Sequence, residues 1–90
     1  MKTSKEILAI NMKYYRYKSK LSQEKFAEAL HTNLVYENQI ENGHRNPSLN
    51  MLDKISKNIS KLIGYTVTSS ELISYDEDKL IDSKRVDERN

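Results

Sequence analysis

The chain has 90 residues, of which 37% are hydrophobic and 31% charged, and it contains no cysteine. This length suffices for one domain of about five helices, and the low apolar fraction predicts a small core that dimerisation would help to stabilise. The lack of cysteine excludes disulfides and thiolate metal sites. The apolar runs are too short for a membrane span or a signal peptide, so we expect a cytoplasmic protein without a membrane partner.

Charge is distributed unevenly along the chain, although the net charge is only +2. Residues 1–20 carry six Lys or Arg side chains against a single Glu, whereas residues 71–90 carry seven acids against four bases. Such asymmetry would attract a polyanion to the N-terminal side of the molecule and so orient the protein on it. A basic helix that merely faces water would give the same pattern, so charge leaves both interpretations open.

The first predicted helix begins near the N-terminus. Thr3 followed by Glu6 forms a capping-box pattern, which satisfies orphan backbone donors at the start of a helix. Leu8, Met12 and Tyr15 then recur at helical spacing and indicate a buried stripe that continues to about residue 17.

Two shorter helices are predicted next, separated by a tight turn. Ser22 is a suitable N-cap, and Phe26 and Leu30 supply the apolar face of a helix that ends at residues 31–32. Asn33 caps the third helix. That helix ends before Gly43, because glycine adopts the left-handed conformation that closes a helix.

A fourth and a fifth helix complete the predicted domain, residues 1–74. Ser48 follows the only proline and begins a helix with apolar residues at helical spacing, which Gly64 ends. Thr68 with Glu71 is a second capping-box pattern at the start of the short fifth helix. Residues 75–90 are highly charged and are predicted to form a C-terminal tail that is either flexible or docks on a partner chain.

No enzyme signature is present in the sequence. The chain lacks a glycine-rich phosphate loop, a nucleophile elbow and zinc-ligand spacing. His31 and His44 lie at predicted helix ends without a partner constellation, so we interpret them as turn residues. We therefore expect no enzymatic activity, no catalytic residue, no metal and no cofactor.

A short helix, a tight turn and a second helix form an arrangement that suits the major groove of DNA. Residues 21–27 (LSQEKFA) and 40–49 (IENGHRNPSL) resemble the signature of the lambda-repressor-like helix-turn-helix proteins, the XRE family. The resemblance extends from about residue 8 to residue 73. It implies an all-α, compact five-helix DNA-binding domain with a short polar C-terminal tail, whose third helix enters the major groove.

The resemblance also implies contacts with the DNA backbone and one internal ion pair. Gln23 matches a glutamine that bonds a phosphate at the start of the second helix, where the helix dipole favours an anion. Arg16 and Glu41 match a partly buried structural ion pair. The loop that contacts phosphates in the family corresponds to Asn42, Arg45 and Asn46.

Base recognition falls on the third helix by the same resemblance. The positions that would face the groove are Asn33, Leu34, Val35, Asn38 and Gln39. The two amides Asn38 and Gln39 can form paired hydrogen bonds to adenine, whereas Leu34 and Val35 would contact only thymine methyl groups. It is an equally good interpretation that one of these two apolar residues belongs to the core instead.

Three departures from the family pattern concern the position of the third helix and its neighbours. Glu37 occupies a position where relatives carry an aliphatic anchor, and burying an unpaired carboxylate is costly. Tyr36 with Ile40 offers an alternative anchor, which would rotate the helix. His31 stands where relatives usually have a glycine with positive φ. Residues 60–67 are about six residues longer than the usual link.

The predicted function is sequence-specific binding of double-stranded DNA as a transcriptional regulator, with repression as the expected outcome. A homodimer on an inverted-repeat operator would place its half-sites about 34 Å apart. Family members of this size include phage repressors, restriction-modification controllers and antitoxins, which the sequence does not separate. The alternative is a protein-interaction module that has lost DNA binding, or an antitoxin-type partner protein. The apolar residues on the third helix and a partner-docking C-terminal segment motivate that alternative.

Overall fold

The computed structural model describes residues 2–89, with side chains described up to residue 86. Within this range the chain forms six α-helices and a terminal 3-10 helix, and no strand. The helices are α1 (Ser4–Ser19), α2 (Gln23–Ala29), α3 (Leu34–Glu41), α4 (Leu49–Ile63), α5 (Ser69–Leu72) and α6 (Glu77–Ser83), followed by η1 (Lys84–Arg89). The expected all-α fold is confirmed.

The helices begin where side-chain oxygens satisfy their first backbone N–H groups. In each of α1 to α5 the N-cap side chain accepts a hydrogen bond from the residue three positions later; these caps are Thr3, Ser22, Asn33, Ser48 and Thr68. The capping box of α1 is complete, because the Glu6 carboxylate also accepts from the backbone N–H of Thr3 at 3.1 Å. The second predicted box is only half formed, since Glu71 bonds the Thr68 hydroxyl instead.

Left-handed residues close several of these helices and turns. Gly64 ends α4 with φ +87°, and Gly43 follows α3 with φ +74°. His31 adopts φ +58° in the turn between α2 and α3. A non-glycine residue in this region is strained by its Cβ, which explains why a glycine would be easier to place here.

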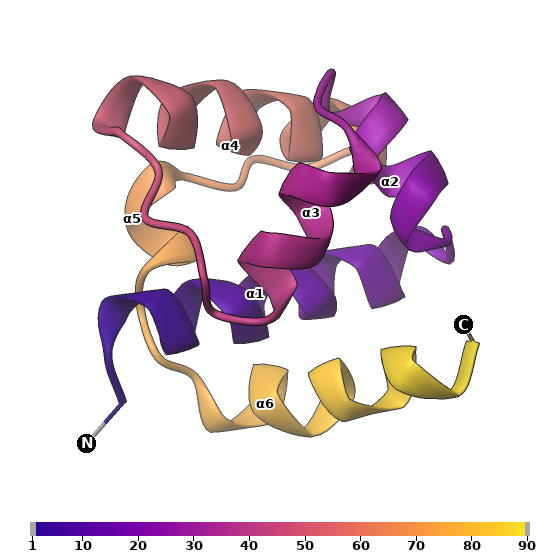
Figure 1. Cartoon of the computed structure of the whole chain (residues 1–90), viewed down its shortest axis with the longest axis vertical. Helices are drawn as coiled ribbons and strands as arrows, with labels where there is room; N and C mark the ends of the chain where they lie inside the picture. The colour runs from indigo at the N-terminus through magenta and orange to yellow at the C-terminus, as the bar shows by residue number, and fades with distance from the viewer. Residues whose placement is uncertain (1, 90) are drawn as a thin grey trace.

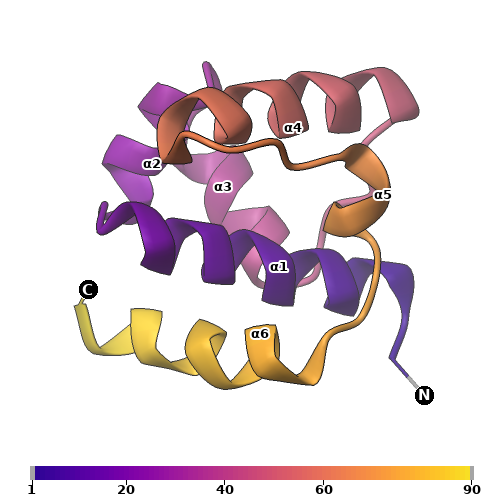
Figure 2. The same ribbon diagram turned by 180° about the vertical axis from the view of Figure 1, so that it is seen from behind.

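The core surrounds α1, which lies between α6 on one side and α3 with α4 on the other (Figures 1 and 2). Fully buried apolar side chains of the core come from α1, from α2 and its C-cap, and from α4; they include Met12, Phe26, Leu30, Ile55 and Ile59. Buried Asn11 on α1 donates to the carbonyls of Glu71, Leu72 and Ser74 and so ties the end of α5 to α1. No helix within residues 2–89 is both long and apolar enough to cross a bilayer.

The segment expected to be a flexible or partner-docking tail folds back onto its own chain. Asp76 caps α6, which packs along α1 on the side away from α3, and η1 continues the contact (Figure 2). Val86 is fully buried, and Lys79 donates to the Tyr15 hydroxyl at 3.1 Å. Lys79 also lies over the rings of Tyr14 and Tyr15 on α1, 5.5 and 5.2 Å from their centres, so cation–π contacts add to the few apolar groups of this segment.

Candidate nucleic-acid interface

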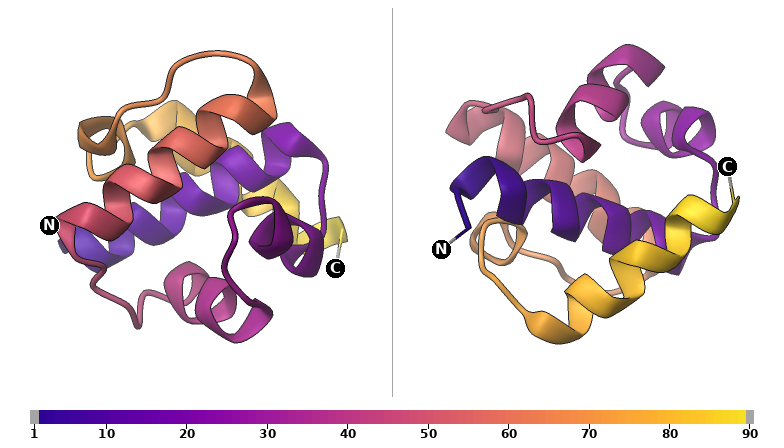
Figure 3. Two further views of the ribbon diagram at one scale, coloured as in Figure 1. Left: turned by 90° about the horizontal axis from the view of Figure 1, so that it is seen from above. Right: turned by 60° about the horizontal axis from the view of Figure 1, so that its bottom comes forward.

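Helix α3 buries one side and exposes the other. Glu37, Ile40 and Glu41 are buried, and they lie on one face because a helix repeats every 3.6 residues. Val35 and Gln39 therefore lie on the opposite side. Figure 3 (left) shows α3 at the margin of the molecule, and neither α6 nor η1 contacts it. The outer side of α3 is thus open to a ligand.

A buried ion pair fixes α3 to α1. Arg16 is fully buried, and its Nε and Nη2 atoms donate to the two carboxylate oxygens of Glu41 at 2.9 and 3.0 Å. Such two-point pairing holds both the position and the orientation of the partners. Burial opposes ionisation of Glu41, but hydrogen bonds from Glu37 and Arg16 outweigh it and lower the pKa of the Glu41 carboxyl.

Glu37 occupies the interior position that an aliphatic residue was expected to fill. Its side chain is fully buried, and no described residue donates a hydrogen bond to either of its oxygens. Burial, followed by the neighbouring Glu41, raises the pKa of Glu37 well above its usual value. Because the raised pKa favours the neutral form, the Glu37 carboxyl holds its proton more strongly in the folded protein than a solvent-exposed glutamate does. Tyr36 is half-buried and packs against the core that contains Ile40, so both Glu37 and the Tyr36–Ile40 pair face the interior.

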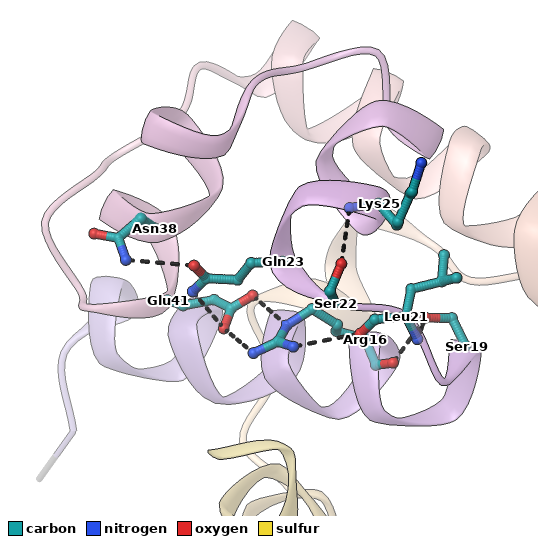
Figure 4. Close-up of polar contacts among 8 residues, drawn as sticks. All are labelled: Arg16, Ser19, Leu21, Ser22, Gln23, Lys25, Asn38 and Glu41. Carbon is teal, nitrogen blue, oxygen red and sulfur yellow. Dashed lines mark hydrogen bonds and ion pairs between the residues drawn. The ribbon is translucent and has the colours of Figure 1, made fainter. Parts of the chain in front are cut away.

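A chain of side-chain amides extends from this ion pair to the surface (Figure 4). Gln23, the first residue of α2, donates to Glu41 at 3.1 Å and accepts from Asn38 at 3.4 Å. Asn38 in turn accepts from Asn42 at 3.1 Å. The start of α2 and one flank of α3 are therefore held in a fixed relation by polar contacts.

A second polar group lies on the other flank of α3. Arg45 donates from Nε to the side-chain amide oxygen (Oε1) of Gln39 at 2.7 Å. Its guanidinium carbon lies 4.7 Å from the centre of the Tyr36 ring, within cation–π range. Sequence reasoning missed Tyr36 as a partner of Arg45, because the two residues are nine positions apart and separated by a loop.

The remaining predicted contact residues lie around these two groups. Asn33 uses its side-chain oxygen to cap α3, accepting from the backbone of Tyr36 at 2.9 Å. Leu34 and Val35 are 45% and 64% exposed, so neither belongs to the core. Asn46 is exposed in the loop after α3. The described part of the chain thus brings the predicted DNA-contacting residues to α3 and its two borders.

The arrangement of α2 and α3 agrees with the proteins to which the chain is similar in sequence. A helix-turn-helix family model matches residues 12–66, which include α2, α3 and α4. The chain belongs to the XRE-type helix-turn-helix family. Control protein C.MunI from Mycoplasma sp is 44% identical over 62 residues, which cover 69% of this chain and 76% of that protein. No solved structure matches the chain significantly.

Membership of the helix-turn-helix family identifies the chain as a DNA-binding transcriptional regulator. The matched region includes α3 and the preceding helix α2. The expected resemblance is therefore confirmed at the level of family and fold.

Proposed function

We propose that the protein represses transcription as a homodimer bound to an inverted-repeat DNA operator. The observation that supports this most strongly is the open outer side of α3, which no other described element covers. An exposed helix has the width of the major groove, and the preceding helix can contact the phosphate backbone. The similar protein C.MunI is named a control protein, which fits a regulatory function.

The proposed contacts divide into backbone and base contacts. Gln23 lies at the N-terminus of α2, where the helix dipole favours a phosphate, and we assign it to the DNA backbone together with Asn42 and Asn46. Asn33, Leu34, Val35, Asn38 and Gln39 are the proposed groove-facing residues of α3. Arg16 with Glu41 holds α3 in place and does not touch DNA.

A salt titration of DNA binding tests this proposal. A duplex selected by the protein from random sequences is titrated at several salt concentrations, while sedimentation measures the mass of the protein alone and in the complex. We expect the logarithm of the affinity to fall linearly with the logarithm of salt concentration, because each neutralised phosphate releases condensed counterions. We also expect two copies per duplex and selected half-sites about 34 Å apart.

Two results of this experiment would contradict the proposal. Failure to bind any duplex at low salt would favour the protein-interaction module, in which Leu34 and Val35 contact a protein instead. A single copy on a site without two-fold symmetry would exclude the homodimer.

A further inference from the structure

We propose that Arg45 reads a guanine base in the major groove, with Tyr36 and Gln39 as the residues that position it. The resemblance placed Arg45 in a loop that contacts phosphates. The structure instead joins it to α3 by a hydrogen bond and a ring contact. This inference rests on the proposed DNA binding and specifies which base the interface recognises.

The Arg45 head group lies beside the outer side of α3. Gln39 lies on the outer side of α3, opposite buried Glu37 and Ile40. Because the Arg45 Nε atom is 2.7 Å from the Gln39 carbonyl oxygen, the guanidinium lies beside the surface that would face the bases. Arg45 therefore extends the recognition surface of α3 from the loop that follows it.

The Arg45 guanidinium keeps several N–H donors available for a ligand. A guanidinium has five N–H donors in a rigid plane, and the Nε–H of Arg45 is used by Gln39. The N–H groups on Nη1 and Nη2 are left, and no described acidic side chain forms an ion pair with them. Two parallel donors match the O6 and N7 acceptors that guanine presents in the major groove.

The Arg45 side chain is also preorganised for a base contact. Arginine normally loses much side-chain freedom when it binds, and this lost entropy weakens the contact. Here the Tyr36 ring, with its centre 4.7 Å from the guanidinium carbon, and the Gln39 carbonyl restrict that freedom before DNA arrives. A phosphate contact needs only a positive charge, whereas a base contact gains from such a fixed orientation.

The assignment also changes the expected contribution of Gln39. A glutamine that reads adenine presents its carbonyl oxygen and its amide N–H group together to the base. In this structure the Gln39 carbonyl already accepts from Arg45. We therefore assign Gln39 to positioning Arg45, and we expect guanine at the base pair that the sequence alone would assign to adenine.

The substitution R45K tests the inference, because it keeps the charge and removes the planar pair of donors. Binding sequences are selected from random duplexes with the wild-type protein and with R45K. We expect R45K to lose the preference for one guanine in each half-site and to bind the wild-type site about 10- to 100-fold more weakly. Binding to unrelated DNA and its salt dependence should stay unchanged, because the charge is retained.

Replacing that guanine with 7-deazaguanine removes the N7 acceptor and provides an independent readout. The modified base should weaken binding of the wild-type protein and leave binding of R45K unchanged. R85K is the matched control, since Arg85 lies in η1, which contacts α1 and α6 and not α3. Y36L removes the ring and should weaken the guanine preference, with thermal unfolding measured to verify that the variant folds.

The possible outcomes separate this inference from the proposed function. If R45K keeps the full guanine preference, or if wild type selects sites without guanine, Arg45 is not a base reader, although the protein still binds a defined operator. If the wild-type protein selects no sequence at all, the proposed function and this inference fail together.

Discussion

The substitution R16M is expected to lower the free energy of unfolding by about 3–5 kcal/mol, the usual cost of removing one partner from a buried ion pair. Methionine fills much of the space of Arg16 but leaves two carboxyl groups, those of Glu37 and Glu41, buried without a cation. Ionised Glu41 would then be unpaired in the interior, so it must take up a proton or unfold the site. Chemical unfolding at neutral pH measures the effect.

Two further variants make the R16M prediction specific. K25M removes a cation whose ion pair with Glu28 is exposed to solvent, and it should change stability by less than about 1 kcal/mol. The double variant R16M/E41L removes both charges and should regain most of the lost stability, because apolar residues can replace a buried ion pair. Equal losses in R16M and K25M would show that the Arg16–Glu41 pair does not hold α3.

The decline of stability with rising pH should disappear when Glu37 is neutralised. The pKa of Glu37 is raised in the folded protein, so its folded carboxyl keeps a proton that the unfolded chain releases above pH 4.5. Between these two pKa values the wild-type protein loses up to about 1.4 kcal/mol of stability per pH unit as pH rises. E37Q cannot ionise, so its stability should lack this decline.

Unfolding curves collected from pH 5 to pH 8 test this prediction. Glu41 acts in a separate window, because its lowered pKa gives stability that is present above pH 4.5 and is lost at more acidic pH. E28Q is the control, since Glu28 is exposed and should leave the pH dependence of the wild-type protein intact. Parallel curves for wild type and E37Q would mean that Glu37 is ionised in the folded state.

The sequence was sufficient to predict the elements that local chemistry determines. Helix ends depend on contacts within a few residues, so they can be recognised from the sequence. Examples are the N-caps Ser22 and Asn33 and the terminating Gly64. The core of α1 and α4 follows from apolar residues at helical spacing. For the same reason the all-α fold and the position of α3 could be predicted.

Features that depend on distant residues could not be predicted in this way. The α6 segment has only a few apolar side chains, and its packing depends on the surface that α1 presents 60 to 70 residues earlier in the chain. The raised pKa of buried Glu37 depends on Glu41 one turn later, whose own position is set by Arg16 on α1, 25 residues earlier in the chain. The contact of Arg45 with Tyr36 likewise arises from a loop whose course the sequence does not specify.

The central claim is that the outer side of α3 binds DNA, and a pair of matched substitutions tests it most directly. Val35 on α3 and Ile81 on α6 are both exposed apolar residues, 64% and 54% accessible, on different sides of α1. We predict that V35E, which places a negative charge against the phosphates, weakens binding to the selected duplex at least about tenfold, whereas I81E leaves it unchanged. Equal affinities for V35E and wild type, or a loss confined to I81E, would contradict this account.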